Sequence, residues 1–315
     1  MKNIWLVLVL FLVFKINAQT DTSKNKPDTA RPSAVSDLPG AIGDTSSMLD
    51  GLDAEEEPDF VQSVFKGTRV INSNTTEMIG KQNLDFRICH RFGFVNTGAY
   101  ELYGLDQALQ RMSFTYGLSD LLNVEIGRSS VNKMYDASIK YKFMRQAKGD
   151  KKRPMSIVYF ANIAVQTLKN TNPQLDPYYF THRLYYTHQL LLSKKISDKF
   201  SLQLMPTLVH RNLIDSMKYK NDVFSLGVAG RNKITRKTAI TYEYFYVFPG
   251  QISPIYHNSL SLGFDIETGG HVFQVQFTNS TGMNEKGYIA ETTGNWLKGD
   301  VHFGFNISRV FYIGR

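Results

Sequence analysis

Apolar side chains occupy every second position through most of the chain after Phe65. In the first clear example, Leu84, Phe86 and Ile88 alternate with charged or small side chains. A period of two is typical of an extended strand whose faces meet different environments, and a slip of one residue would exchange those faces. The same alternation recurs at 111–116, 122–127, 137–143, 240–246, 259–266 and 300–308.

Less regular strands are expected at 155–166, 181–193, 200–210, 222–232 and 271–279. The total is about twelve, and most segments approach the roughly 9–11 residues that a tilted strand needs to cross a bilayer. Bacterial barrels also prefer an even number of strands. We therefore predict an all-β fold, a transmembrane antiparallel up-and-down β-barrel of about twelve strands.

A soluble β-sandwich is the alternative fold for regularly spaced strands. Its strands usually run about 5–6 residues, whereas the apolar face here is too large for one soluble core. The links between strands also favour the barrel, because short and long links alternate like the periplasmic turns and outer loops of outer-membrane barrels. The brief link near 130–135 is an exception, and the expected long links are 93–110, 167–180, 211–221 and 280–298.

Residues 1–18 have the features of a secretory signal peptide. Lys2 supplies the positive charge, residues 4–14 are apolar, and Ala18 is a small residue suited to cleavage. The apolar run is too short to cross a bilayer, which takes about 20 apolar residues. We therefore expect export, cleavage and a location in the outer membrane of a Gram-negative bacterium.

The next segment, residues 19–64, is rich in Thr, Ser, Asp, Pro and Gly and contains an acidic run at 53–57. Such a composition buries too little apolar surface to offset the entropy of ordering. We expect a disordered periplasmic tether here, followed by the barrel domain at 65–315. The tether is a candidate docking segment for a periplasmic protein.

Export also affects how the positive charge of the chain is interpreted. Cleavage after Ala18 would remove Lys2 and Lys15 and no acidic residue, which lowers the formal net charge from +8 to +6. This surplus suits anionic lipid headgroups or lipopolysaccharide, and no nucleic acid partner is expected for an exported chain. Barrel-assembly machinery is another expected partner, because residues 303–311 resemble the carboxy-terminal strand that it recognises. Three residues, 313–315, follow the last aromatic side chains, which departs from the usual pattern.

Four segments carry a resemblance to a known family: YELYGLDQA at 100–108, HRNL at 210–213, FDIETGGHVFQ at 264–274 and FGFNISRVF at 303–311. Together they resemble an uncharacterised family of β-barrel proteins, a domain of unknown function found in gliding and gut Gram-negative bacteria. The resemblance extends from about Phe65 to Phe311. It implies a barrel in the outer membrane and implies no activity.

Candidate catalytic and metal-binding residues are few. Cys89 is the only cysteine, and the seven histidines show no metal-ligand or HExxH spacing, so no metal and no cofactor is expected. His257 and Ser259 have the His-x-Ser spacing of an outer-membrane phospholipase, in which the imidazole activates the hydroxyl. The residues after Ser259 depart from that family, and Ser259 falls on the predicted lumen face. A lipid-modifying enzyme is therefore a remote alternative, and we expect no enzyme.

Charged side chains on the predicted inward face are the candidate functional residues. A ring of such charges can select small solutes, or the charges can pair across a narrow interior and close it. The candidate eyelet consists of Arg87, Arg91, Arg111, Lys140, Lys142, Arg183, Arg231, Glu125, Glu243 and Asp265. The first functional hypothesis is a narrow passive channel for small polar or anionic solutes. The alternative is a closed barrel that acts as a scaffold or docking partner for a periplasmic protein.

Overall fold

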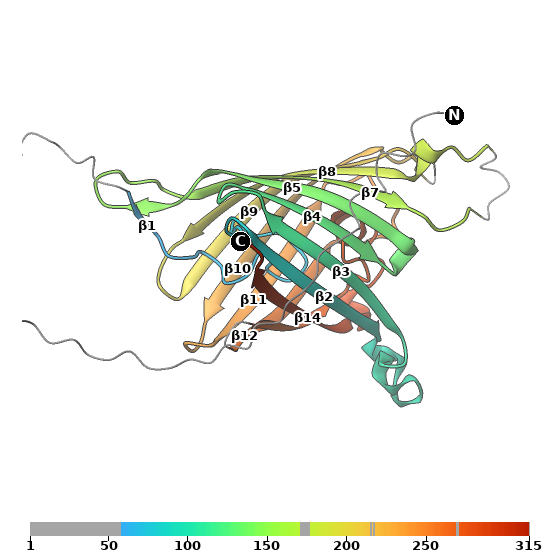
Figure 1. Ribbon diagram of the computed structural model, residues 1–315. Helices are drawn as coiled ribbons and strands as arrows, with labels where there is room; N and C mark the ends of the chain where they lie inside the picture. Colours follow the sequence, from blue (N-terminus) through green and yellow to red (C-terminus); the bar gives the residue numbers. More distant parts are fainter. Residues whose placement is uncertain (1–57, 171–176, 215, 217, 269–270, 315) are drawn as a thin grey trace, which may run out of the picture. The chain divides into compact units, whose positions relative to one another are not determined.

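Twelve antiparallel strands close into a barrel in the computed structural model, which describes residues 58–170, 177–214, 216, 218–268 and 271–314 (Figure 1). They are β2 (Asn83–Phe94), β3 (Ala108–Gly117), β4 (Leu122–Ser129), β5 (Met134–Met144), β7 (Ser156–Gln166), β8 (Leu184–Lys195), β9 (Phe200–Arg211), β10 (Asp222–Lys233), β11 (Thr238–Val247), β12 (Ser259–Thr268), β13 (His271–Thr278) and β14 (His302–Tyr312). Each strand pairs with the next along the wall, and β14 pairs with β2 to close it. The predicted fold class and strand number are confirmed.

Alternate residues of each strand face opposite sides of the wall, because successive side chains of a strand point in opposite directions. On β12, Leu262 and Phe264 are exposed, whereas Ser261 and Asp265 are buried. Exposed apolar side chains on other strands include Phe114, Ile126, Ile139, Leu204 and Phe224. An outward apolar band of this kind is the surface that lipid covers in a membrane barrel.

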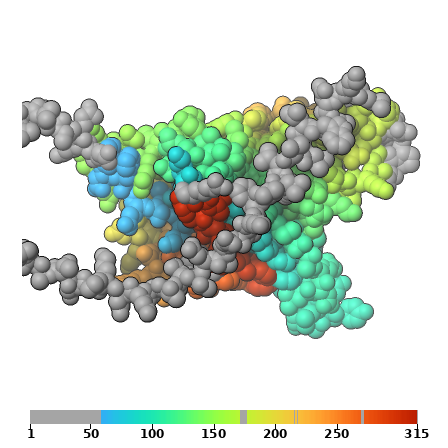
Figure 2. Space-filling model, in the orientation of Figure 1, coloured from blue at the N-terminus to red at the C-terminus, as the bar shows by residue number. Residues whose placement is uncertain are grey.

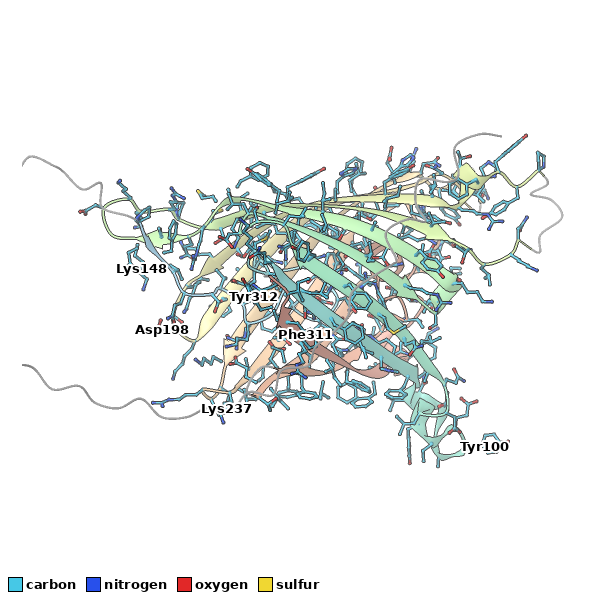
Figure 3. The ribbon with its side chains drawn as sticks, in the orientation of Figure 1. Tyr100, Lys148, Asp198, Lys237, Phe311 and Tyr312 are labelled. Atoms are coloured by element: carbon cyan, nitrogen blue, oxygen red, sulfur yellow. The ribbon has the colours of Figure 1, made fainter. Side chains whose placement is uncertain are left out.

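The two ends of the barrel differ in their links. Lys148, Asp198 and Lys237 lie at one end, and Tyr100 lies at the other (Figure 3). Links at the first end are mostly short, whereas the opposite end carries the long links, and one of these, at 95–107, protrudes from the surface (Figure 2). We call them the inner and outer ends, because the short turns of outer-membrane barrels face the periplasm.

The link between β5 and β7 is the exception at the inner end. It contains β6 (Ala147–Lys148), which pairs with β1 (Asp59–Phe60). The next residue, Val61, donates its backbone N–H to Gln146 O at 3.0 Å. The segment that precedes the barrel is therefore attached to the inner end. Residues 19–57, most of the predicted tether, lie outside the described residues, as does the predicted signal peptide.

Residues 61–79, here called the plug, lie inside the barrel and not in its wall. Phe65, Arg69 and Ile71 are among its many buried residues. Hydrogen bonds join the plug to inward side chains around the wall, including Asn123 on β4, Gln203 on β9, Glu243 on β11 and Asn306 on β14. Partners on strands so far apart in the wall place the plug in the middle of the lumen.

The plug turns back on itself and leaves by the end at which it entered. Val70 N donates to Ser73 O at 2.9 Å, and the chain then returns through Gly80 to the inner end of β2. Gly117, at the inner end of β3, allows this exit, because a Cβ there would lie 2.1 Å from the carbonyl oxygen of Gly80. The plug is therefore a loop with both of its ends at the inner opening.

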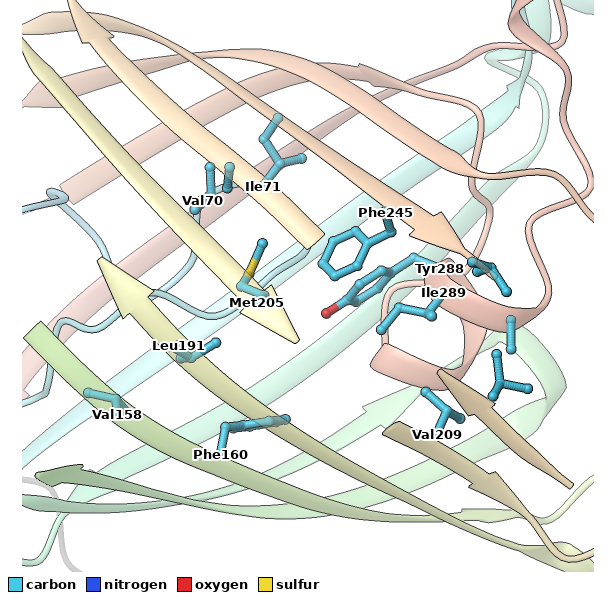
Figure 4. Close-up of a cluster of buried hydrophobic side chains, with 14 of the residues drawn as sticks. Val70, Ile71, Val158, Phe160, Leu191, Met205, Val209, Phe245, Tyr288 and Ile289 are labelled. Atoms are coloured by element: carbon cyan, nitrogen blue, oxygen red, sulfur yellow. The ribbon is translucent and has the colours of Figure 1, made fainter. Parts of the chain in front are cut away.

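The long link between β13 and β14 fills the lumen from the outer end. It contains α1 (Glu285–Ala290), whose residues are all buried and whose N-terminus is capped by the Asn284 side chain. Tyr288 and Ile289 of α1 share an apolar cluster with Val70 and Ile71 of the plug (Figure 4). Within the described part of the chain, no helix has the length and apolar character needed to cross a bilayer.

Candidate functional site in the barrel lumen

Glu125 on β4 joins the plug to the wall. Its Oε1 accepts hydrogen bonds from Arg69 of the plug and from Arg111 on β3, both at 2.8 Å. Its Oε2 accepts from the hydroxyl of Thr115 at 2.7 Å, and Arg111 also donates to Asp136 Oδ2 at 2.5 Å. Each of these two buried arginines therefore has a carboxylate partner, and such pairing offsets part of the cost of burying a charge.

Glu243 on β11 holds the tip of the plug. Its Oε1 accepts from the backbone N–H of Asn72 at 2.9 Å and from its side-chain amide at 2.7 Å. Its Oε2 accepts from the backbone N–H of Ser73 at 3.0 Å and from its hydroxyl at 2.7 Å. A buried N–H group without an acceptor is costly, so this carboxylate replaces the partners that a strand or helix would supply.

Three of the predicted inward cations bind the plug. Arg87 donates to Thr68 Oγ1 at 2.7 Å, and Arg91 donates to Asn72 Oδ1 at 2.5 Å. Lys140 on β5 donates to the carbonyl oxygen of Thr75 at 3.0 Å. These three side chains of the predicted eyelet therefore lie in the lumen, where they donate hydrogen bonds to oxygens of the plug.

Arg231 and Asp265 lie in the lumen near its inner end. Arg231 Nε is 3.6 Å from Asp265 Oδ2, and Arg231 Nη2 is 3.2 Å from Glu267 Oε1. Glu267 also pairs with Lys66 of the plug at 3.0 Å. The Lys66 side chain is 47% exposed, so water reaches this group of charges.

Lys142 and Arg183 lie away from these networks. Lys142 is partly exposed at the inner rim, where its backbone N–H donates to Leu121 O in the turn between β3 and β4. Arg183 lies in η6 (Phe180–Arg183), a single 3-10 turn of the outer link, with its guanidinium 4.9 Å from the ring centre of Tyr178. The strand expected from residue 181 begins only at Leu184, so Arg183 lies in the outer link and not in the strand.

Glu285 of α1 reaches the plug from the outer side. Its Oε1 lies 3.4 Å from Arg69 Nη1 and accepts from the Asn74 amide at 3.1 Å. Its Oε2 has no hydrogen-bond partner in the described chain. Burial raises the pKa of the Glu285 carboxyl above its ordinary value, against the opposing effect of Arg69. The outer link and the plug therefore share one buried ionisable contact.

Little space remains between the plug and the wall beside Thr115, Glu125 and Lys140. A cavity there measures about 10 Å³, roughly the volume that one water needs. In this conformation the plug and α1 occupy the middle of the lumen. The inward charges alone do not decide whether the interior is open or filled, and the structure shows the middle of it occupied by the plug and α1.

The plug is the functional element that the sequence analysis missed. The alternation that marks every clear strand is absent from residues 65–80. In its place stands a run of hydrogen-bonding residues, Asn72 to Thr76, directly after the apolar pair Val70 and Ile71. A polar run of this kind inside a barrel domain, before its first strand, indicates a segment that binds a polar lumen.

The geometry gives little support to nucleophilic catalysis by His257 and Ser259 or to metal binding. His257 lies in the link before β12, where its backbone N–H donates to Thr292 O at 2.7 Å. Ser259 is buried, and its hydroxyl has no hydrogen-bond partner among the described residues. In the same part of the chain, no three His, Cys, Asp or Glu side chains gather where they could hold a metal ion.

These features define a class of protein, the membrane-spanning antiparallel β-barrel with a lumen filled by its own chain. The chain belongs to the family described as a membrane bound beta barrel domain (DUF5777), whose model matches residues 65–311. The resemblance inferred from the four sequence segments is thereby confirmed.

Several solved outer-membrane porins and channels have distantly similar folds. The NanC porin is 7% identical with a TM-score of 0.44, over 73% of this chain and 98% of that chain. The KdgM porin is 10% identical with a TM-score of 0.42, over 73% and 98% of the two chains. An outer membrane channel from Pseudomonas putida F1 is 11% identical with a TM-score of 0.40, over 74% and 97%. No curated protein matches the chain.

Proposed function

We propose that this outer-membrane barrel is a channel held closed by its plug, and that small polar or anionic solutes pass when the plug leaves the lumen. One observation carries the proposal: the plug enters and leaves through the same opening. Val61 is attached to Gln146 at the inner end, and Ile79 leads back to that end through Gly80. A loop with both ends at one opening can be withdrawn without breaking the ladder of the wall.

The hydrogen bonds between the plug and the wall are compatible with withdrawal of the plug. On the wall side they are made by side chains, so breaking them leaves the backbone of the strands in place. Gln274 donates to Val70 O at 2.7 Å, Asn306 donates to Ile71 O at 3.0 Å, and Gln203 donates to Asn74 O at 2.7 Å. Each such bond can be exchanged for bonds to water, so its net contribution to stability is modest, about 0.5–1.5 kcal/mol. The backbone hydrogen bonds between neighbouring strands are unaffected by the exchange.

The charges behind the plug indicate the class of solute. Withdrawal would expose Arg87, Arg91 and Arg111 to the water-filled lumen. Charged side chains that line a pore select ions and polar solutes of the opposite sign. The three arginines therefore favour small polar or anionic solutes, although Glu125 and Glu243 limit the preference.

A closed scaffold is the second candidate function, and the apolar cluster favours it. Inward residues of β7, β8 and β11, namely Phe160, Leu191 and Phe245, belong to one cluster with Val70 and Ile71 of the plug (Figure 4). Exposure of apolar surface costs about 25 cal/mol per Å², so this cluster opposes release of the plug. A permanently closed barrel would present the acidic run 53–57 to a periplasmic protein.

Planar-bilayer conductance of the refolded full chain tests the channel. Arg69→Gln and Glu243→Gln weaken the contacts between plug and wall, whereas Lys237→Gln removes an exposed charge of the inner turn between β10 and β11 and is the control. We expect rare steps from the unmodified chain and from the control, and frequent anion-preferring steps in a salt gradient from the other two variants.

The opposite result would support the scaffold. Suppose that protease cleaves the plug in Arg69→Gln and Glu243→Gln, while neither inserted barrel shows conductance steps. The barrel then does not conduct even when the plug has left the lumen, and the channel function is ruled out. Loss of a co-purifying periplasmic protein on deletion of residues 19–57, with the barrel still inserted, would then identify the scaffold role.

A further inference from the structure

A second cavity lies at the outer end of the barrel, apart from the charges that hold the plug. Its volume is about 350 Å³, and it lies among the outer ends of β7, β8 and β9 and the α1 segment. Polar groups dominate its lining, which includes Gln166, Lys169, Arg211, Lys286 and Glu291. Cavities of about 300–1,000 Å³ are the usual size for small-molecule sites.

Arg211, the last residue of β9, is a buried cation in this lining. Its side chain is 4% exposed. Its Nη2 donates to two backbone carbonyl oxygens, Lys220 O at 2.7 Å and Gln251 O at 3.3 Å, and its Nε has no hydrogen-bond partner in the described chain. Both acceptors are neutral, and a buried charge without an opposite charge is costly. An anion bound in the cavity would supply the missing charge.

Lys286 and Lys169 add to the positive charge of the cavity. Lys286 is 3% exposed, lies 2.7 Å from Glu291 Oε1, and stands 3.9 Å from the ring centre of Tyr185. Lys169 is exposed at the rim. Glu291 balances one of the three cations, so the lining keeps a positive surplus that attracts an anion.

Uncharged polar groups of the lining indicate what else the ligand carries. The amides of Asn132 and Gln166 both donate and accept hydrogen bonds, whereas the rings of Tyr178 and Tyr185 in the same lining already face the cations Arg183 and Lys286. Amides that donate and accept suit a molecule that carries hydroxyl groups beside its charge, because a hydroxyl group also donates and accepts. A simple halide or phosphate would leave most of this lining unused.

We propose that this cavity binds a small carboxylate that carries hydroxyl groups, such as a sugar acid, with Arg211 as its main anchor. The assignment deepens the proposed channel function by naming a solute class at the outer mouth. Binding at the outer mouth requires no withdrawal of the plug. It is therefore measured on the closed barrel, and its failure is distinct from failure of conductance.

Titration calorimetry of the full chain in detergent micelles tests the assignment, with D-glucuronate as the probe and D-glucose as its neutral counterpart. We expect glucuronate to bind and glucose to bind at least about ten-fold more weakly, since glucose lacks the carboxylate that would accept charge-assisted hydrogen bonds from Arg211. Arg211→Gln should weaken glucuronate binding by about ten-fold or more. Lys237→Gln, an exposed cation at the inner end (Figure 3), should leave it unchanged.

Lys169→Gln is a second variant in case Arg211→Gln does not fold. Lys169 is exposed at the rim, so its substitution should leave folding unaffected. It should weaken glucuronate binding by about two- to five-fold, as expected for a partly solvated charge. Absence of glucuronate binding to the unmodified chain, equal binding of glucose, or unchanged binding in every folded lining variant would overturn the assignment.

Discussion

The guanidinium of Arg69 lies 2.8 Å from the Glu125 carboxylate, and this buried contact joins the plug to wall strand β4. Both side chains are almost fully buried, and each has a second charged partner, Glu285 for Arg69 and Arg111 for Glu125. One network therefore extends from the wall through the plug to α1. This connection makes the occupancy of the lumen testable by single substitutions.

Arg69→Gln should release the plug, because the change leaves Glu125 and Glu285 without one of their cations. Breaking a buried ion pair from one side costs about 3–5 kcal/mol. Limited proteolysis of the inserted barrel should then cut within residues 61–79 much faster than in the unmodified chain. Lys66→Gln removes a partly exposed cation of the same plug and should cost less than about 1 kcal/mol. Equal protection of all three chains would contradict the role given to Arg69.

Glu243→Gln should loosen the tip of the plug. An amide has one accepting oxygen, so some of the four donors from Asn72 and Ser73 would lose their acceptor, at a cost of about 1–3 kcal/mol. Hydrogen exchange at Asn72 and Ser73 should accelerate, while exchange in β11 should stay slow. Asp198→Asn, at an exposed inner turn, is the matched control. Unchanged exchange at the tip would show that Glu243 does not hold it.

Ile71→Ala should weaken the packing of the plug in the apolar cluster that it shares with α1 and with inward residues of β7, β8 and β11. Ile71 is 1% exposed in the cluster with Tyr288 and Phe245, and truncation of such a side chain costs about 2–5 kcal/mol. Urea titration of the refolded barrel, followed by protease access to the plug, should show release at lower urea. Leu297→Ala truncates a side chain that is 98% exposed and should leave the midpoint unchanged. A shift of the midpoint in both variants would mean that packing in the lumen is not its cause.

Docking of α1 should weaken as the pH rises. Burial raises the pKa of Glu285 above its ordinary 4.5, so the docked state binds this proton more tightly than the undocked state. The stabilisation is then complete below about pH 4.5 and is lost as the pH rises through the raised pKa. Amide protection factors of residues 285–290, corrected for intrinsic exchange, should follow that course.

Glu285→Gln should abolish this pH dependence, since the amide does not titrate. Asp106→Asn, in the exposed outer link between β2 and β3, should preserve it. Protection that rises with pH in the unmodified chain would reverse the sign and contradict the assignment.

The wall of the barrel could be predicted from local pattern, because its strands repeat one rule along the chain. Asp85 and Arg87 are inward and Phe86 is outward for the same reason that Ser261 is inward and Leu262 is outward: successive side chains of a strand point to opposite faces. The inward charges of the candidate site followed from the same rule. Arg183 did not, because the rule holds only within a strand and β8 starts one residue later.

Local pattern along the chain is enough to predict the class of fold, an approximate number of strands, the two faces of the wall and many of its inward charges. What occupies the lumen, by contrast, follows from contacts that form when the chain is folded. Arg69 and Glu125 are separated by 56 positions, and Arg69 and Glu285 by 216. No local period relates such residues, since their contacts depend on how the closed barrel brings distant strands around one axis.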